Sequence, residues 1–351
     1  MSRLPRPRLL RRASGFVATA AVIGLLAACT VSPDSKRADT TPTPTVTADP
    51  VTPETIRTAP NTSVFAGGIA VEPNSLADRA EASLTSDGKE AQAAAAADIA
   101  RRPVAMWIGD GYTDEQLSKE ITDYLAAAEQ QHKTAVFVTY AIPNRDCGDY
   151  SAGGLSADRY GAWNSKIVAE LTGHRAVVMI EPDSLAMLSN CPAEADVRIP
   201  LIKAAVEQYS AAGIPAYLDA GNSHWVEPKL MAERLRAAGV EQARGFFTNV
   251  ASFYPVDDER SYAGKISALT GGSHFVIDVS RNGQGWKGTW CNPDGVGLGQ
   301  DPHVTGGGES KLDALLWIKT PGISDGTCNG GPAAGEWFPS FAQGLVERKA
   351  D

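Results

Sequence analysis

A carboxylate in the middle of this chain stands where catalysis could occur. Asp183 directly follows the apolar run Val177–Ile180, in the segment Glu181-Pro182-Asp183. An apolar run rich in β-branched residues predicts a buried strand. Because proline cannot continue a central ladder, the strand must end there and the chain must turn. Two interpretations of Asp183 follow: it caps a helix over Ser184–Leu188, or it is a catalytic group on a stiff turn.

Further polar residues occupy equivalent positions, just after other predicted strands. The carboxyl ends of parallel strands meet at one face of a barrel, and barrel enzymes carry their active sites on that face. Helix capping would explain one or two such aspartates, but not a larger set that includes a lysine. The residues are Asp146, Asp219, Asn249, Asp278, Arg281, Asn282, Lys319 and Asp325.

Aromatic residues accompany these carboxylates near the same strand ends. They are Trp107, Tyr140, Trp225, Trp286 and Trp290. Flat and partly apolar ligands such as sugar rings bind well to aromatic faces. Glycosidic bond hydrolysis needs one carboxyl group that stays protonated, to donate to the leaving oxygen, and another that activates water. The combination therefore favours glycoside hydrolysis.

Signatures of other chemistries are missing from the sequence. It contains no His-Glu-x-x-His motif and no Cys-x-x-Cys, and its histidines show no ligand spacing. No glycine-rich phosphate fingerprint follows the first predicted strand. We therefore expect neither a metal nor a cofactor. The formal net charge of -9 argues against nucleic acid as a partner.

The elements that would position these residues alternate between helix and strand. A helix is predicted over Glu90–Ala100 with Ser86 or Asp87 as its cap, and Thr113 and Gln116 form a capping box before the next helix. This alternation indicates an α/β fold with a parallel sheet and, at this length, a closed or nearly closed barrel. The predicted strands are Val104–Ile108, Ala135–Tyr140, Ala176–Glu181, Pro215–Asp219, Gly245–Asn249, His274–Val279 and Ala314–Lys319.

The N-terminal part differs from the rest in composition. Residues 1–28 combine arginines with an apolar stretch and end before Cys29, a pattern typical of a bacterial lipoprotein signal peptide whose Cys29 carries the lipid. An ordinary signal peptide with an incidental cysteine is the alternative. Residues 29–70 are rich in Thr and Pro and predict a tether, and residues 71–351 form the predicted catalytic domain. We expect an exported protein, lipid-anchored to the outer face of the cell membrane or released outside the cell.

The remaining cysteines fit an exported protein with two disulfides. Four cysteines allow three pairings. Cys147 and Cys191 follow neighbouring predicted strands, and so do Cys291 and Cys328. We therefore expect the bridges Cys147–Cys191 and Cys291–Cys328, each bracing a loop that carries an aspartate.

Several short motifs, taken in order, resemble glycoside hydrolase family 6, the cellulases that cleave β-1,4-glucan with inversion. The resemblance runs from about Val104 to Ala342. It implies a distorted, incomplete TIM-like barrel of about seven parallel strands with outer helices, which agrees with the strands predicted above. The motifs are Tyr140–Cys147, Glu181–Asp183, Leu218–Trp225, Val279–Gly283, Trp290-Cys291, Trp317–Gly322 and Asp325-Gly326.

The resemblance also implies roles for individual residues. Asp183 matches the catalytic acid, Asp146 the aspartate that raises the pKa of the acid and steers water, and Asp325 the candidate base. Tyr140 would crowd the distorted sugar ring, and Ser151 would lie near the attacking water. The further substrate contacts would be Trp107, Asp219, Trp225, Asn249, Trp290 and Lys319.

One position departs from the family pattern. The family usually carries a glutamate two residues before the last aspartate, and here that residue is Ile323, so a substrate contact would be lost. The compact segment Arg281–Leu312 resembles the open-cleft endoglucanases. We therefore expect a monomer that binds β-glucan, cleaves internal bonds and touches the membrane only through its lipid. The alternatives are a chain-end-acting cellobiohydrolase of the same family and a catalytically weak glycan-binding lipoprotein.

Overall fold

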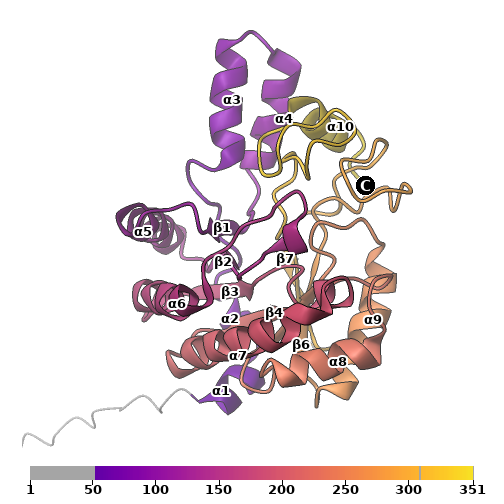
Figure 1. Cartoon of the computed structure of the whole chain (residues 1–351). Coiled ribbons are helices and arrows are strands. Elements are labelled where there is room, and N and C mark those ends of the chain that lie inside the picture. Colours follow the sequence, from indigo (N-terminus) through magenta and orange to yellow (C-terminus); the bar gives the residue numbers. More distant parts are fainter. Residues whose placement is uncertain (1–51, 308–309, 351) are drawn as a thin grey trace, which may run out of the picture. The chain divides into compact units, whose positions relative to one another are not determined.

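A curled sheet forms the centre of the fold (Figure 1). In residues 52–307 and 310–350, which the computed structural model describes, eight strands pair in the order β1-β2-β3-β4-β5-β6-β8-β7. Neighbouring strands are parallel, except that β7 runs antiparallel to β8. The strands are β1 (Met106–Gly109), β2 (Ala135–Tyr140), β3 (Ala176–Ile180), β4 (Ala216–Asp219), β5 (Gly245–Thr248), β6 (His274–Asp278), β7 (His303–Val304) and β8 (Leu312–Leu316).

The sheet curls into a barrel that is not fully closed. In the described part of the chain, a backbone hydrogen bond from Ala105 N to Trp317 O (2.9 Å) joins the β1 and β8 sides of the seam in place of a ladder. The predicted incomplete barrel of about seven parallel strands is confirmed. The additional strand β7 escaped prediction because two residues, His303 and Val304, are too few to show a periodic pattern.

Helices cover the outer face of the sheet (Figure 1). The predicted helix Glu90–Ala100 is confirmed, but its predicted cap is wrong: Ser86 ends the preceding helix, and Lys89 is the N-cap. The capping box of Thr113 and Gln116 is present. The longer helices are α3 (Leu76–Ser86), α4 (Glu90–Ala100), α5 (Asp114–Gln130), α6 (Ala157–Leu171), α7 (Ala195–Ala211), α8 (Pro228–Ala237), α9 (Val256–Leu269) and α10 (Pro339–Glu347).

Alternate residues of each strand pack into two different apolar clusters. In β3, Val178 and Ile180 belong to the cluster that includes residues of the outer helices. Val177 and Met179 belong to a second cluster, which contains residues of the other strands. Successive side chains of a strand point to opposite faces, so the second cluster fills the barrel interior. Both faces of the strands are therefore buried, which explains their nearly continuous apolar sequence.

Residues 52–70 are folded against the barrel. Here α1 (Pro53–Thr58) and α2 (Asn61–Val64) precede Phe65, which is 1 % exposed. Arg244 Nη1 donates to the carbonyl oxygens of Ile56 (3.0 Å) and Ala59 (2.6 Å). The predicted tether over residues 29–70 is therefore wrong for its last part, because a few apolar side chains in a Thr/Pro-rich stretch suffice for docking. The predicted signal peptide, Cys29 and the tether up to residue 51 lie outside the described residues.

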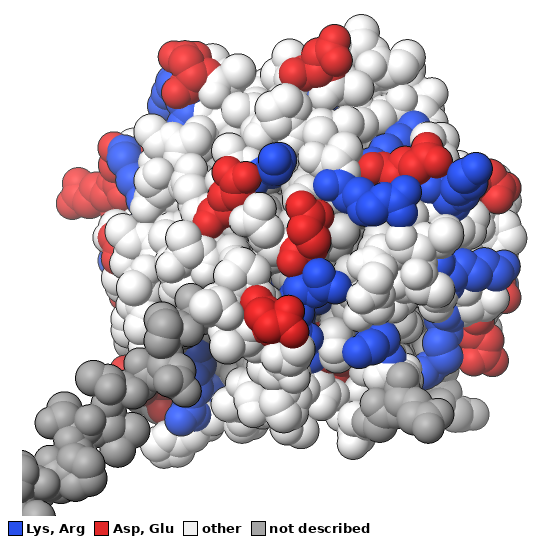
Figure 2. Space-filling model, turned by 90° about the horizontal axis from the view of Figure 1, so that it is seen from below, with Lys and Arg blue, Asp and Glu red and all other residues white. Residues whose placement is uncertain are grey.

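The charged surface is mixed in sign. Figure 2 shows the molecule from below, where Lys and Arg side chains are interspersed with Asp and Glu side chains. Some of the exposed charges form helical pairs, such as Lys203 with Glu207. Among the helices that the structure describes, none has the length and apolar character needed to cross a membrane.

Candidate active site

The turn after β3 carries Asp183 in an unusual backbone conformation. Glu181 and Asp183 both have positive φ angles, 52° and 70°. The Glu181 carboxylate is fully buried and accepts hydrogen bonds from Ala141 N (2.9 Å), Ile142 N (3.0 Å) and the Tyr160 hydroxyl (3.0 Å). Such strain persists only where surrounding contacts hold it. Glu181 supplies these contacts and ties the turn to the loop after β2.

Asp219, and not Asp183, caps the short helix after the turn. This helix, η2 (Ala186–Ser189), receives no capping bond from its own N-cap residue. Asp219 instead accepts from Leu185 N (3.1 Å), Ala186 N (3.0 Å) and Gly221 N (2.9 Å). The Asp219 side chain is buried and turns toward these amides, and its contact with substrate stays a prediction. Asp183 is left free to face the cavity described below.

The surroundings of Asp183 favour its protonated form. Burial, followed by the nearby carboxylates of Asp219 and Asp146, raises the pKa of Asp183 to about 8. Lys319 acts in the opposite direction and is outweighed. Asp183 is therefore largely protonated at neutral pH, so it can donate a proton.

Asp146 holds a serine and, through it, a tyrosine. Its Oδ2 accepts from both the backbone N–H and the hydroxyl of Ser151, each at 2.8 Å. The Ser151 hydroxyl lies 3.0 Å from the Tyr140 hydroxyl. Burial raises the pKa of Tyr140, so it stays neutral. The three predicted residues Asp146, Ser151 and Tyr140 thus form one hydrogen-bonded chain.

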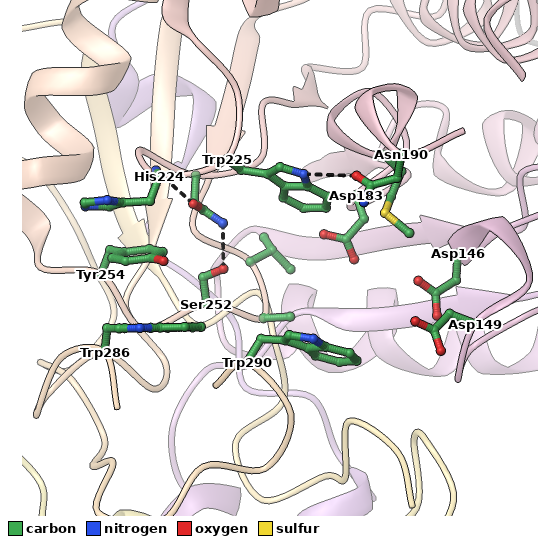
Figure 3. A pocket seen from close by; sticks show the side chains of 14 residues that line it. Asp146, Asp149, Asp183, Asn190, His224, Trp225, Ser252, Tyr254, Trp286 and Trp290 are labelled. Carbon is green, nitrogen blue, oxygen red and sulfur yellow. Dashed lines mark hydrogen bonds between the residues drawn. The ribbon is translucent and has the colours of Figure 1, made fainter. Parts of the chain in front are cut away.

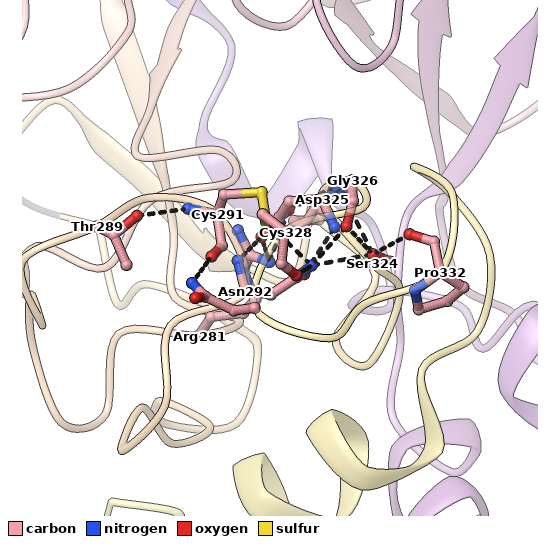
Figure 4. The surroundings of a disulfide bond; sticks show 11 residues. Arg281, Thr289, Cys291, Asn292, Ser324, Asp325, Gly326, Cys328 and Pro332 are labelled. Carbon is pink, nitrogen blue, oxygen red and sulfur yellow. Dashed lines mark hydrogen bonds and ion pairs between the residues drawn. A yellow bond between two sulfur atoms is a disulfide. The ribbon is translucent and has the colours of Figure 1, made fainter.

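Asp325 lies in a different electrostatic environment. Arg281 Nη1 donates to both of its carboxylate oxygens at 2.9 Å, and Lys319 Nζ lies 3.3 Å from Oδ1. Asn292 N adds a third donor at 3.1 Å (Figure 4). Burial alone would raise the pKa of Asp325, but Arg281 and Lys319 outweigh it and hold that pKa below its usual range. Asp325 is therefore a fixed anion.

Two disulfides brace the loops that carry these aspartates. Cys147 pairs with Cys191, and Cys291 with Cys328, so both predicted pairings are confirmed. The second bridge lies beside Asn292, whose side chain binds Ser324 Oγ and Gly326 O (Figure 4). The loops after β3 and β8 are thus each held by a covalent link.

A cavity of about 340 Å³ opens beside Asp183 (Figure 3). In Figure 3, Asp183 and Asp146 lie toward one end, and the rings of Trp225 and Trp290 border the middle. Trp225 Nε1 donates to Asn190 Oδ1 (3.3 Å), which fixes its indole ring. The lining residues are Asp146, Asp149, Asp183, Met187, Asn190, Asn222, His224, Trp225, Val250, Ala251, Ser252, Tyr254, Trp286 and Trp290.

Comparison with known proteins identifies the family. The family model for glycosyl hydrolases family 6 matches residues 68–349. The chain belongs to glycosyl hydrolase family 6. This membership places it among the glycoside hydrolases.

The relatives of this family 6 hydrolase include bacterial endoglucanases. It is 42% identical over 244 residues to endoglucanase A of Cellulomonas fimi, a match that covers 70% of this chain but only about half (54%) of that protein. It is 36% identical over 300 residues to endoglucanase 1 of Streptomyces halstedii, covering 82% of this chain and 91% of the other.

A solved endoglucanase shares the fold. The endoglucanase Cel6 of Mycobacterium tuberculosis, in complex with methyl-cellobiosyl-4-deoxy-4-thio-β-D-cellobioside, superposes with a TM-score of 0.73 at 36% identity. The alignment covers 80% of this chain and 96% of that one. The incomplete barrel described above is thus the fold of a known family 6 enzyme.

Several predicted substrate contacts of this family 6 hydrolase lie beside or behind the cavity. Trp107 packs edge-on against Tyr140, with ring centroids 5.1 Å apart, and Lys319 Nζ lies 5.8 Å from the Trp107 ring. Asn249 is fully buried, and its side chain donates to Tyr254 O and Asp278 O at 3.0 Å. The Asn249 amide thus holds the backbone of the next loop, and its contact with substrate stays a prediction.

The position that departs from the family pattern is also buried. Ile323 is 7% exposed and pairs with Trp337 in an isolated antiparallel bridge. An apolar side chain suits this place because the residue is buried. Of the described residues, no group of three or more His, Cys, Asp and Glu side chains is arranged to hold a metal ion.

One part of the cavity has little signal in the sequence. His224, Tyr254 and Trp286 line it from the loops after β4, β5 and β6. The sequence indicates Trp286 as an aromatic residue after a strand, and nothing in the local pattern distinguishes Tyr254 from a core tyrosine. Their association depends on the sheet order, which brings three loops together that are distant in sequence.

Proposed function

We propose that this protein hydrolyses internal β-1,4-glucosidic bonds in cellulose or a related β-glucan with inversion of anomeric configuration. The main support for this proposal is the raised pKa of Asp183, about 8, at a cavity that is lined by aromatic residues and by Asp146. The two endoglucanase relatives and the solved endoglucanase support the reaction and the substrate class.

Asp183 would act as the general acid. It donates its proton to the glycosidic oxygen as the bond to the anomeric carbon breaks, so the leaving sugar departs as a neutral alcohol. Trp225 and Trp290 would hold glucosyl rings by their faces, because both line the same cavity. Trp107 and Lys319 would contact the sugar chain from the Tyr140 side.

The water that attacks the anomeric carbon must lose a proton. Ser151 lies between Tyr140 and Asp146, and its hydroxyl group donates a hydrogen bond to Asp146 Oδ2 at 2.8 Å. We assign the proton to Asp146, passed through Ser151 from a water on the opposite ring face. Asp325, the candidate base, is a weaker proton acceptor because its pKa is lowered and Arg281 occupies both oxygens. Its fixed negative charge would stabilise the positive charge that develops on the sugar ring.

Release of reducing ends from carboxymethyl-cellulose tests the reaction. The wild-type protein should release them, and proton NMR should show the α-anomer as the first product. An initial β-anomer would overturn inversion. A protein that binds cello-oligosaccharides without releasing reducing ends would instead be a glycan-binding lipoprotein.

The mode of cleavage has its own test. An enzyme that cuts internal bonds lowers the viscosity of carboxymethyl-cellulose steeply while few reducing ends appear. A chain-end-acting cellobiohydrolase releases cellobiose with little loss of viscosity. We expect the first behaviour, as in the named endoglucanase relatives.

Export and anchoring form the last part of the proposal. The two disulfides are consistent with an oxidising, extracytoplasmic location. Cys29 would carry a lipid that anchors the protein to the outer face of the cell membrane. A Cys29→Ala variant should then appear in the culture medium, whereas an unchanged membrane fraction would contradict lipidation. In this proposal the protein acts as a monomer.

A further inference from the structure

Three aromatic rings from three loops stack at the end of the cavity away from Asp146 (Figure 3). The rings of His224 and Tyr254 lie 4.2 Å apart with an interplanar angle of 22°, and those of Tyr254 and Trp286 lie 5.4 Å apart at 14°. We call His224, Tyr254 and Trp286 the aromatic stack. Its rings have the separations of favourable offset stacking.

The aromatic stack is held rigidly from behind. Asn249 Nδ2 and Asn282 Nδ2 both donate to Tyr254 O, at 3.0 and 3.1 Å. Asn249 is fully buried, so it fixes the backbone of Tyr254 against the strand ends. A rigid aromatic platform loses little conformational entropy when a ligand binds.

Trp286 remains exposed although it belongs to the stack. It is 42% exposed, and in the described part of the chain only Trp290, at 45%, is another tryptophan exposed to that extent. Both tryptophans line the cavity that contains Asp183. A large exposed apolar surface next to polar groups marks a ligand site more often than it serves the core.

Polar groups accompany the rings at this end. Asn222 Nδ2 donates to Ser252 Oγ (3.0 Å), and both side chains line the cavity with Tyr254 (Figure 3). Sugar rings need apolar faces for their C–H groups and polar partners for their hydroxyls. The Tyr254 ring is stacked against both His224 and Trp286, so the exposed ring of Trp286 offers the apolar contact, and Asn222 and Ser252 offer the polar ones.

We propose that the aromatic stack is a further sugar-binding site, which takes a glucosyl unit of the β-glucan chain beyond the units held at Trp225 and Trp290. The proposal rests on the proposed function for the identity of the ligand. Its effect is on substrate length: a chain that reaches the stack gains binding energy, and a shorter chain does not. Tyr254 and Trp286 are then specificity-determining residues and take no part in the chemical step.

The first test measures kcat/KM on cello-oligosaccharides of increasing length. In the Trp286→Ala variant, kcat/KM should fall about fivefold to tenfold for oligosaccharides long enough to reach the stack, the factor that one aromatic contact of roughly 1 kcal/mol or somewhat more supplies. For cellotriose and other short substrates it should be unchanged. Leu269→Ala is the matched control, because Leu269 is similarly exposed (44%) at the end of α9 and does not line the cavity.

A second variant separates recognition from bracing of the loops. Tyr254→Phe keeps the stacked ring but removes its hydroxyl group, so it should lower kcat/KM for long substrates less than Trp286→Ala does, with the melting temperature unchanged. Equal losses for all substrate lengths, together with a lower melting temperature, would mean that the stack only braces the loops. That result, or no loss at any length, would overturn the proposal.

A binding measurement keeps this inference separate from the proposed reaction. Calorimetry on an Asp183→Asn background should show that Trp286→Ala weakens cellohexaose binding about fivefold to tenfold and leaves cellotriose binding unchanged. An inactive wild-type protein that shows this length dependence would overturn the hydrolase function and leave the site intact. An active wild-type protein without the length dependence would overturn the site alone.

Discussion

The two sides of the cleft carry aspartates with opposite character. Asp183 and Asp325 both lie in loops that follow parallel strands, and a disulfide braces each loop. Burial acts to raise the pKa of both. Asp183 faces the carboxylates of Asp219 and Asp146, whereas Asp325 is paired with Arg281 and Lys319. The neighbouring charges, and not the depth of burial, therefore decide which group keeps its proton.

The acid side should respond most strongly to Asp183→Asn. The amide cannot donate an acidic proton, so kcat should fall by about 10²–10⁴-fold, the usual contribution of a general acid. Binding of cellotetraose, measured by calorimetry, should change little because the shape is kept. Asp149→Asn is the control, since Asp149 lines the cavity but is exposed. Substantial activity in Asp183→Asn would assign the acid to another residue.

The anion side should respond in stability as well as in rate. Asp325→Ala leaves Arg281 and Lys319 as buried cations without their common partner. The free energy of unfolding, measured with urea, should fall by about 3–5 kcal/mol, the usual cost of an unpaired buried charge. A loss below about 1 kcal/mol would show that the pairing is weaker than its geometry indicates. Asp183→Asn should not show this loss, which distinguishes the two sides.

Glu181 extends the comparison to a buried carboxylate that forms no salt bridge with any residue the structure describes. Burial raises its pKa to about 7, and backbone donors of Ala141 and Ile142 act against this. In Glu181→Gln an amide N–H group faces Ala141 N in either orientation of the side chain, because Ala141 N donates to both carboxylate oxygens, at a cost of about 1–3 kcal/mol. We expect kcat to fall while KM is nearly unchanged, because the turn and the loop of Asp146 shift relative to each other.

Tyr160→Phe is the matched control for Glu181→Gln. It removes the hydroxyl that donates to Glu181 and leaves both backbone donors in place. Its effect on kcat should be smaller. Equal effects of the two substitutions would show that the backbone donors do not position the turn.

The pH profile gives the smallest but most direct measure of the acid side. With the pKa of Asp183 at about 8, kcat/KM should fall as the pH rises through that value, because the proton donor is lost. Asp146→Asn removes an anion that disfavours ionisation of Asp183, so the alkaline limb should move to lower pH, along with a lower rate. Ser151→Ala keeps the charge of Asp146 and should leave the limb in place. An unmoved limb in Asp146→Asn would exclude this electrostatic contribution.

The sequence correctly predicted the elements that position the site. The parallel strands, the two disulfides and the turn at Asp183 all depend on local patterns, such as apolar runs, proline and cysteine positions. The role of Asp219 as the residue that caps the helix after the Asp183 turn could not be predicted. Both aspartates end strands, and only the three-dimensional position of Leu185 and Ala186 shows which one caps the helix.

Contacts between distant loops were the least predictable features. Arg281 and Asp325 lie 44 residues apart, and the aromatic stack joins the loops after three strands. The folded segment at 52–70 was hidden by its Thr/Pro-rich composition, although Ile56 and Phe65 are buried. In each case the partner is set by the order of strands in the sheet, which a local pattern does not contain.

The docking of α1 has a consequence for how the enzyme is presented to its substrate. Arg244, which binds the carbonyl groups next to α1, directly precedes β5, whereas Asp183 and Asp325 follow their strands. Parallel strands all begin at one end of a barrel and finish at the other. The chain therefore enters the barrel at the end opposite the cleft. The start of the described chain therefore does not obstruct the cleft, where long polymer chains can enter and cut ends can diffuse away.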